Sequence, residues 1–373
     1  MTILHLASYG RWTGAAAPAF GEVEALREAS VDALYGYVGG GSLEAKIGHH
    51  PFAVPLLKRE QDPVSVIRTI RRLRRFVREK GITLIHAHLS HDHWLAVATR
   101  RATPGLRLVR TFHNRRALRR NPLTRRLVLS TDGICVVNAD FVELGILARS
   151  EPLFTPPPVN RRVYTPEGRQ VRARYGIPDD VPLVGFIGKI DPSRGFEEAI
   201  RAFACLRGRL GRAMMMIIGR GPHRPFLERF ASRLGVAESI LWAGYHEDTL
   251  PEHYRAMNAL LFTVPGSDEG HRAVSEALAS GVPVACYPVP GIAAVLGEDL
   301  ARRLVAPASE PEPLSRIVER VLADPTALRH EAVRQTERFD YVRTAERLAG
   351  LYRRLGVLGS SKEPGASSPP LHV

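Results

Sequence analysis

The sequence predicts an α/β protein of two domains, each built on a parallel β-sheet. Its 373 residues exceed what one ordinary hydrophobic core organises. Short apolar runs typical of buried strands alternate with segments of helical periodicity through most of the chain. Between the two series lie residues 155–169, with four prolines and few apolar side chains, which we interpret as the boundary between the domains.

The first series contains four predicted strands and a strongly basic helix. The helix follows from apolar residues that recur at helical spacing between Val66 and Val77, with six arginines around them, and Gly81 ends it. The predicted strands are residues 3–7, 82–86, 106–112 and 133–137.

The second series repeats this rhythm after the proline-rich segment. A helix is predicted over residues 196–206 and a last one over residues 343–355. The tail from Gly359 to Val373 is rich in Ser, Pro and Gly, so we expect it to be disordered. The predicted strands are residues 183–188, 213–219, 240–243, 259–263 and 284–287.

Composition limits the location and the partners of the chain. Its three cysteines show no metal-ligand spacing, which is typical of reduced thiols, and its first residues lack the pattern of a signal peptide. No apolar run approaches 18 residues. We therefore expect a cytoplasmic protein.

The net charge of +14 is concentrated in one part of the chain. Ten arginines and no Asp or Glu lie between Arg100 and Arg126. A basic surface attracts phosphates on a substrate, an anionic lipid or a nucleic acid. The alternative is a sequence that uses Arg wherever any surface residue would serve. Only Phe112 offers a ring for base stacking within the run, so nucleic acid is disfavoured.

The segment of residues 265–284 carries the strongest functional pattern. Asp268 is followed eight positions later by Glu276, inside a helical run whose start offers free backbone N–H groups. Two carboxylates that flank a helix start suit a ligand with hydroxyl groups at both ends and phosphates between them, as in a nucleotide-sugar. The alternative is that Asp268 caps the helix and Glu276 is an ordinary surface charge.

This segment resembles the E-x7-E signature of retaining glycosyltransferases with the GT-B fold, of the group 1, family 4-like type. The resemblance implies two Rossmann-like α/β domains that face a central cleft. It also implies that Glu276 binds the ribose hydroxyls and that Asp268, in place of the usual Glu, contacts the transferred sugar. The closing residues resemble the last helix of this fold, which crosses back to the first domain.

The resemblance also divides the chain. It implies an acceptor-side domain of residues 1–165 plus the C-terminal crossing helix of residues 338–358. A nucleotide-sugar-binding domain of residues 166–337 and the tail 359–373 complete the division.

A second resemblance lies at the first βα turn of the second domain. Gly188 ends a strand, and Lys189 and Arg194 follow it, similar to the G-R-L-x-x-x-K-G turn that holds the donor diphosphate in this family. The two cations stand in exchanged order, so Lys189 lacks the forked geometry that Arg would offer. Two surface cations beside a turn are the alternative.

Five further residues are candidates for the donor site. Gly270 would permit close approach of the donor, Arg272 would contact phosphate, and the backbone N–H groups of Ala273 and Val274 would bind phosphate oxygens. Gly14 matches the glycine-rich loop after the first strand, where a plain connection is the alternative.

Histidines provide the remaining candidates. Similar enzymes place a histidine at the position of His113, facing the sugar, where it can donate a hydrogen bond or move a proton. A loop histidine bonded to backbone is the alternative. A metal site formed by His86, His88, His91 and His93 would need a second ligand cluster, which the sequence lacks.

The resemblance therefore implies a metal-independent enzyme that retains configuration and uses a UDP- or GDP-linked sugar, with no cofactor. The expected acceptor is a cell-envelope glycan, a lipid-linked precursor or an acidic compound, reached from the inner face of an anionic membrane. The alternative is a catalytically weakened protein of this fold that binds a nucleotide-sugar or a partner.

Overall fold

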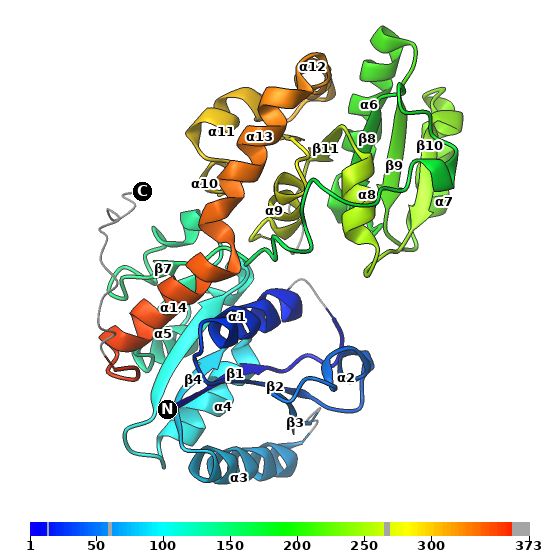
Figure 1. Ribbon diagram of the computed structural model, residues 1–373. Helices are drawn as coiled ribbons and strands as arrows, with labels where there is room; N and C mark the ends of the chain where they lie inside the picture. The colour runs from blue at the N-terminus through cyan, green and yellow to red at the C-terminus, as the bar shows by residue number, and fades with distance from the viewer. Residues whose placement is uncertain (13–14, 59–61, 265–268, 360–373) are drawn as a thin grey trace.

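The computed structural model describes residues 1–12, 15–58, 62–264 and 269–359. Within these ranges the chain forms two α/β domains, each with a sheet whose strands all pair in parallel (Figure 1). The predicted class of a two-domain α/β fold is therefore confirmed. Predicted site residues Gly14 and Asp268, and the tail from residue 360 onward, lie outside the described residues.

The sheet of the first domain has the strand order β3-β2-β1-β4-β5-β6-β7. The order reverses direction between β1 and β4, and ligands of such sheets bind beyond the carboxyl ends of the strands at this reversal. The strands are β1 (Thr2–Ala7), β2 (Ala33–Val38), β3 (Ala53–Leu57), β4 (Ile82–Ala87), β5 (Arg107–Phe112), β6 (Gly133–Val136) and β7 (Leu153–Phe154).

Local sequence explains the basic helix of this domain, α3. Asp62 caps it by accepting a 2.9 Å hydrogen bond from Ser65 N, and a proline occupies its first turn. Leu73 and Val77 are buried beneath it, whereas Arg68, Arg71, Arg75 and Arg78 are exposed. Arg74 is partly buried and donates a 2.8 Å hydrogen bond to the Ala98 carbonyl. The helices are α1 (Ala16–Glu28), α2 (Ser42–Ile47), α3 (Pro63–Glu79), α4 (Ser90–Arg100) and α5 (Pro122–Leu129).

The sheet of the second domain has the order β10-β9-β8-β11-β12, so β8 lies between β9 and β11. The loops that follow these three strands therefore share one edge of the sheet. The strands are β8 (Leu183–Ile187), β9 (Met214–Ile218), β10 (Ile240–Gly244), β11 (Ala259–Phe262) and β12 (Val284–Cys286).

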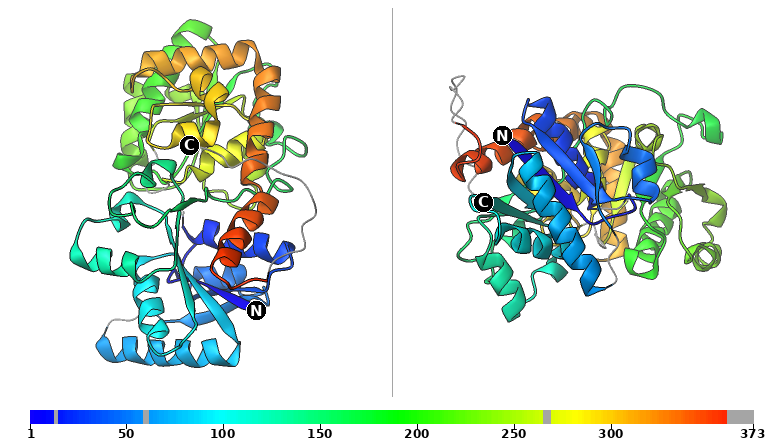
Figure 2. Two further views of the ribbon diagram at one scale, coloured as in Figure 1. Left: turned by 90° about the vertical axis from the view of Figure 1, so that its left-hand side faces the viewer. Right: turned by 90° about the horizontal axis from the view of Figure 1, so that it is seen from below.

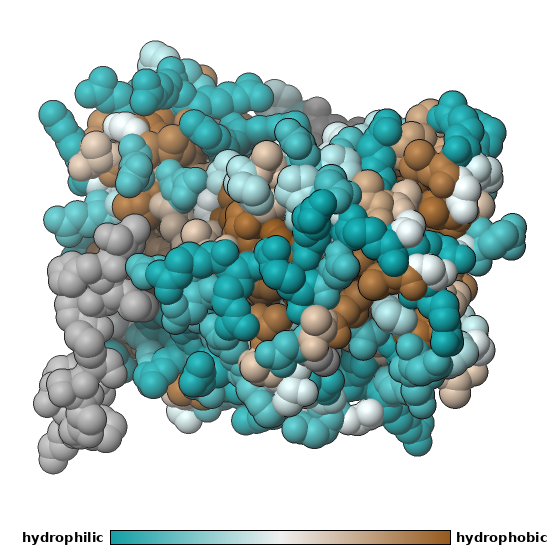
Figure 3. Space-filling view, turned by 90° about the horizontal axis from the view of Figure 1, so that it is seen from above, coloured by the Kyte–Doolittle hydropathy of each residue, from teal (hydrophilic) through white to brown (hydrophobic). Residues whose placement is uncertain are grey.

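Helices cover both faces of this second sheet (Figures 1 and 2). Their apolar sides form one continuous core with the strands. The outer surface seen in Figure 3 is mostly hydrophilic, with small hydrophobic areas between the polar side chains. The helices are α6 (Phe196–Leu210), α7 (Arg224–Arg233), α8 (Leu250–Ala256), α9 (Arg272–Ala279), α10 (Ile292–Leu296), α11 (Glu298–Leu304), α12 (Pro311–Ala323), α13 (Pro325–Gln335) and α14 (Tyr341–Arg354).

Helix α14 packs against the first domain, although it follows the second domain in sequence. It lies beside α1 in Figure 1, and the Tyr341 hydroxyl donates a 2.9 Å hydrogen bond to Glu24 of α1. Leu348 and Tyr352 are buried in the same core as Ile3 of β1. The second domain is thereby bound to the first at both ends of its chain. None of the helices in the described ranges is long and apolar enough to cross a membrane.

Candidate active site

The predicted diphosphate-binding turn lies at the carboxyl end of β8. Lys189 follows Gly188 and is 64% exposed, with its Nζ 3.5 Å from a carboxylate oxygen of Asp191. Arg194 ends a short 3-10 helix, Pro192–Arg194, that leads into α6. Both cations therefore follow the central strand of the sheet at the edge where ligands bind.

Gly195 fixes the path of this turn. Its φ of +70° lies in the left-handed region, and a Cβ added to it would lie 2.2 Å from Oγ1 of Thr263. The Thr263 hydroxyl donates a 2.9 Å hydrogen bond to the Gly195 carbonyl. The end of β11 therefore holds the residue next to Arg194, and glycine is needed at this contact.

Glu276 is buried on α9, directly after β11 and the segment outside the described residues. It is 4% exposed, its Oε2 accepts a 3.1 Å hydrogen bond from the Tyr254 hydroxyl, and its Oε1 lies 3.4 Å from the Arg272 guanidinium. A buried carboxylate needs such partners. This burial argues against the alternative of an ordinary surface charge.

The start of α9 is shaped by His271 and Gly270. His271 precedes the helix with a φ of +57°, is buried, and bonds through Nε2 to the Pro290 carbonyl at 2.9 Å. A Cβ on Gly270 would lie 2.6 Å from Pro157 of the interdomain segment. Glycine at position 270 therefore permits close approach of the two domains. This role is separate from the contact with a donor that the sequence predicts.

The backbone N–H groups of α9 differ in their surroundings. Val274 N already donates a 3.0 Å hydrogen bond to the His271 carbonyl, so a phosphate would have to share this donor. The Ala273 carbonyl accepts a 3.2 Å hydrogen bond from Tyr254. The phosphate contacts expected from Ala273, Val274 and Arg272 remain predictions.

A cavity of 870 Å³ opens between the two domains and is lined by both. Lys46 of the first domain lies 2.5 Å from a carboxylate oxygen of Glu247 in the second. Asn138 bridges the same domains by donating to the carbonyls of Glu269 and Pro290 at 2.8 and 3.0 Å. The carboxylate of Glu269 itself accepts a 3.1 Å hydrogen bond from Arg115 N of the first domain.

His113 lies just beyond β5, at the edge of the first sheet that faces the ligand side. It lines a pocket of 340 Å³ together with Arg116 and Arg119, and its Nε2 lies 3.0 Å from Nδ1 of His88. Burial lowers the pKa of His113 to about 3, so its ring is neutral at physiological pH. The hydrogen-bond partner of His113 is thus the side chain of His88. The alternative of a loop histidine had predicted a backbone partner.

The ten arginines of residues 100–126 serve different purposes. Arg100 and Arg107 pair with Asp132, at 2.9 and 3.3 Å, and Arg110 is buried and donates to the carbonyls of Ala87 and Thr111. Arg116 and Arg119 line the pocket beside His113. The positive charge of the run is therefore only partly paired within the first domain, and part of it borders the pocket that His113 lines.

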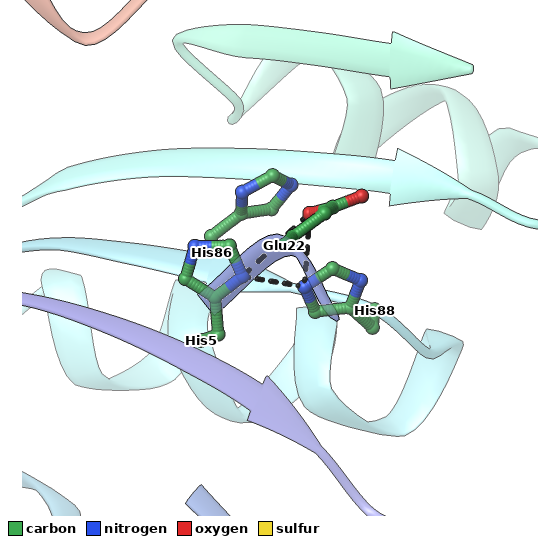
Figure 4. A group of neighbouring side chains, drawn as sticks. All are labelled: His5, Glu22, His86 and His88. Atoms are coloured by element: carbon green, nitrogen blue, oxygen red, sulfur yellow. Dashed lines mark hydrogen bonds and ion pairs between the residues drawn. The ribbon is translucent and has the colours of Figure 1, made fainter. Parts of the chain in front are cut away.

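The four histidines of the run, His86, His88, His91 and His93, do not converge on one site. His91 and His93 lie in the first turn of α4, as expected, and His93 bonds to Thr131 at 2.7 Å. His86 and His88 converge instead with His5 of β1 and Glu22 of α1, and one ligand-type atom from each of these four lies within 4.8 Å of the others (Figure 4).

This buried group of His5, Glu22, His86 and His88 was not predicted. His5 and Glu22 stand far from His88 in sequence, and His5 becomes the neighbour of His86 only because β1 pairs with β4. The only signal was a polar residue inside each of two apolar runs. Tyr254 and Asn138 were missed for the same reason, since their contacts exist only after folding.

Two family profiles match the chain one after the other. Residues 22–144 match "Glycosyltransferase Family 4", and residues 168–339 match "Glycosyl transferases group 1". The chain therefore carries a region of the glycosyltransferase family 4 type followed by a region of the group 1 type. The group 1 match includes Lys189, Arg194 and Glu276, whereas the family 4 match includes His113.

Curated proteins are similar to this chain over parts of their length. A 2-deoxystreptamine glucosyltransferase from Streptomyces kanamyceticus is 32% identical over 43% of this chain and 41% of the relative. A D-inositol 3-phosphate glycosyltransferase from Acidothermus cellulolyticus is 28% identical over 74% of this chain and 68% of the relative. The chain spans about half the length of most curated relatives it matches, between 36% and 68% in those compared.

Solved structures confirm the predicted GT-B architecture. Anabaena Alr3699/HepE, solved in complex with UDP, superposes with a TM-score of 0.79 at 18% identity, over 95% of this chain and all of that one. A sucrose-phosphate synthase from Thermosynechococcus elongatus gives a TM-score of 0.75 at 18% identity, over 95% of this chain and 99% of that one. At such identity the likeness establishes the fold.

Proposed function

We propose that this protein moves a sugar from a nucleotide-sugar donor to an acceptor hydroxyl with retention of anomeric configuration. The observation that carries the proposal is the buried Glu276 carboxylate, held by Tyr254 and Arg272 at the edge where the Lys189 turn also lies. A carboxylate held beside cations suits a ligand that combines ribose hydroxyls with a diphosphate. Solved neighbours of the same fold contain UDP and UDP-glucose, which supports a UDP-linked donor, with GDP-linked donors as the other class.

In the proposed reaction the bond between the anomeric carbon and the oxygen of the donor phosphate breaks. The acceptor oxygen forms a bond to the same carbon, on the face of the sugar that the phosphate leaves. The acceptor proton leaves with the diphosphate. Lys189 and Arg194 stabilise the charge that develops on this leaving group, and the start of α9 with Gly270, Arg272, Ala273 and Val274 assists them. Because these groups neutralise the diphosphate, we propose that donor binding needs no metal.

Residues on both sides of the cleft complete the proposal. Asp268, which lies outside the described residues, would contact the transferred sugar, and His113 would face the sugar from the first domain. Gly14 would border the donor phosphates or the acceptor. Closure of the domains around the bound donor would exclude water and limit its hydrolysis.

The proposed acceptor is anionic or lipid-linked. Arg116 and Arg119 beside His113 supply positive charge on the acceptor side. Two of the relatives point the same way by name, a D-inositol 3-phosphate glycosyltransferase and a mannosyltransferase that acts on a phosphatidylinositol monomannoside. A cell-envelope precursor presented at the inner face of an anionic membrane fits this chemistry.

Thermal stabilisation of the purified protein by UDP, GDP and ADP, with and without EDTA, tests the donor site. We expect one nucleotide to raise Tm in the presence of EDTA, and Glu276→Ala and Lys189→Ala to abolish the shift. Arg201→Ala is the control, since Arg201 is an exposed cation of α6 paired with Glu198. A folded protein that none of the nucleotides stabilises would remove the donor-site assignment.

Detection of the transferred product distinguishes the enzyme from a binding module. Incubation with UDP-glucose or GDP-mannose and D-inositol 3-phosphate should yield a glycosylated product whose anomeric coupling matches that of the donor. Binding of a nucleotide with no transfer and no donor hydrolysis would favour the catalytically weakened alternative. A product of inverted configuration would contradict the proposed retention.

A further inference from the structure

A continuous chain of buried hydrogen bonds ends at His113. It begins at Thr111 on β5 and passes through side chains of β4, α14 and β1 before it reaches the pocket that His113 lines. Each ring nitrogen of His5, His86 and His88 takes part in it. The links are Thr111 Oγ1 to His86 Nε2 at 2.6 Å, His86 Nδ1 to Tyr352 Oη at 2.7 Å, Tyr352 Oη to His5 Nε2 at 3.1 Å, His5 Nδ1 to His88 Nε2 at 2.9 Å, and His88 Nδ1 to His113 Nε2 at 3.0 Å.

The imidazoles of this chain are neutral. Burial lowers the pKa of His5 and His113 to about 3 and the pKa of His88 well below its ordinary value. A neutral imidazole carries one N–H and one lone pair, so it donates on one side and accepts on the other. The links from Tyr352 through His5 and His88 to His113 must therefore all point in one direction, and that direction decides the tautomer of His113.

The lengths of the two Tyr352 links indicate the direction. The Tyr352 oxygen lies 2.7 Å from His86 and 3.1 Å from His5, and a phenol has one proton to donate. Bonds donated by O–H are shorter than bonds donated by N–H. Tyr352 therefore donates to His86 and accepts from His5. Each ring then donates on the side nearer Tyr352 and accepts on the other, so His113 donates to His88 and His88 donates to His5.

We propose that His88 is a positioning residue that holds His113 as the tautomer protonated on Nε2. The other nitrogen, Nδ1, then offers a lone pair on a ring that lines the 340 Å³ pocket, where it accepts a hydrogen bond from a substrate hydroxyl. The link to a substrate rests on the proposed function, whereas the tautomer is a property of the free protein.

A metal ion is the competing explanation for the group in Figure 4. Oε2 of Glu22 lies 3.7 Å from His5 Nδ1 and 3.8 Å from His88 Nε2, close enough for one cation to join all three. However, both of these nitrogens are already committed to each other at 2.9 Å, and a cation would have to break that link. Burial also raises the pKa of Glu22 to about 8, so the carboxyl is protonated at neutral pH and the group carries no charge for a cation to balance.

Nitrogen-15 NMR of the histidine side chains tests the tautomer without any substrate. The unprotonated nitrogen of a neutral imidazole resonates far downfield of the protonated one, and His113→Asn assigns the signals. We expect a single tautomer with the proton on Nε2 in the wild type. His88→Leu should give a mixture of tautomers, because the acceptor for this proton is gone. His88→Asn should restore the wild-type state, because its amide oxygen can occupy the place of Nδ1.

Two further variants separate positioning from general damage to the core. His93→Asn removes a buried histidine of α4 that bonds to Thr131 and stands outside the chain, so it should lower Tm yet leave the His113 signals unchanged. Glu22→Gln mimics the protonated carboxyl and should also leave them unchanged. A wild-type His113 with its proton on Nδ1, or signals that His88→Leu does not alter, would overturn the proposal. Stoichiometric zinc that survives purification and shifts these signals would replace it with the metal site.

Steady-state kinetics, measured with the donor that the transfer assay identifies, test whether the tautomer of His113 matters for the reaction. We expect His88→Leu to lower kcat about tenfold with little change in donor KM, as for loss of one hydrogen bond made in the transition state. His88→Asn should recover most of the rate, and His93→Asn should match the wild type at a temperature where all variants are folded. Unchanged kcat in His88→Leu would refute the positioning role. If no transfer occurs in the wild type while the tautomer is as predicted, the proposed function fails and the tautomer assignment stands.

Discussion

The hydroxyl of Tyr254 lies 3.1 Å from Oε2 of Glu276 and 3.2 Å from the carbonyl of Ala273, so one phenol joins α8 to both the start of α9 and its buried carboxylate. Both Tyr254 and Glu276 are buried. The strand β11 and the segment before α9 separate them in sequence. The position of the proposed ribose-binding group is thus set by a residue that no motif includes.

Tyr254→Phe should weaken binding of the stabilising nucleotide about fivefold, because loss of one hydrogen bond costs about 1 kcal/mol. Isothermal titration calorimetry measures this. Tyr341→Phe is the matched control, since it removes a 2.9 Å bond between a tyrosine and Glu24 in the first domain. We expect Tyr341→Phe to lower stability without changing nucleotide affinity. Equal affinities for the two variants would mean that Tyr254 does not position Glu276.

Gly195→Ala should disrupt the Lys189 turn, because the new Cβ would meet Oγ1 of Thr263 at 2.2 Å. Gly211→Ala introduces an alanine at a similar φ, +65°, in open space. Both variants should lose about 1 kcal/mol of stability from the left-handed backbone. Only Gly195→Ala should also lose the nucleotide-induced rise in Tm. Retained nucleotide binding in Gly195→Ala would show that this turn does not contribute to the site.

Glu22→Gln should change how stability depends on pH. The pKa of Glu22 is raised to about 8 in the folded protein, so the unfolded chain binds fewer protons here between about pH 4.5 and 8. In this window Glu22 ionises in the unfolded chain but stays protonated in the folded protein. The free energy of unfolding of the wild type therefore falls as pH rises, by up to about 1.4 kcal/mol per pH unit. Denaturation in urea at several pH values should show that the free energy of unfolding declines less with rising pH in Glu22→Gln than in the wild type. Parallel curves would mean that Glu22 is ionised in the folded protein.

Asn138→Ala should uncouple the two domains. Asn138 is buried and donates to the carbonyls of Glu269 and Pro290, both in the second domain. Leaving these carbonyls without a donor costs about 1–3 kcal/mol. Calorimetry should show the unfolding transitions of the two domains moving apart. Asn121→Ala, which removes the cap of α5 within the first domain, should lower stability without separating them.

Local patterns were sufficient for part of the fold. Strands β1, β4, β8, β9 and β11 coincide with apolar runs, because a parallel strand is buried on both faces. Helix α3 followed from its apolar stripe, since one of its sides faces water. Helix α1 was missed: most of its residues are buried, so no polar stripe marks its period. Strand β3 was missed because Pro55 interrupts it.

The candidate site divides in the same way. Lys189, Arg194 and Glu276 could be predicted as candidates because each lies in a turn or a short helix with a recognisable local composition, and their roles remain predictions. The expected contact of Gly270 with the donor remains a prediction, whereas the structure also places Gly270 against Pro157, which the sequence did not indicate. Its nearest neighbour belongs to another segment of the chain, and local spacing carries no information on that.

By itself the sequence determined two parallel α/β domains, the break between them, and the loops that carry cations and a carboxylate, because burial and turn chemistry act over a few neighbouring residues. Only the tertiary structure decided which polar groups are partners. His5 meets His88 through the pairing of β1 with β4, and Tyr352 reaches both His5 and His86 only because α14 returns to the first domain. A buried hydrogen bond depends on the positions of both partners in space, and these positions exist only when the whole chain is folded.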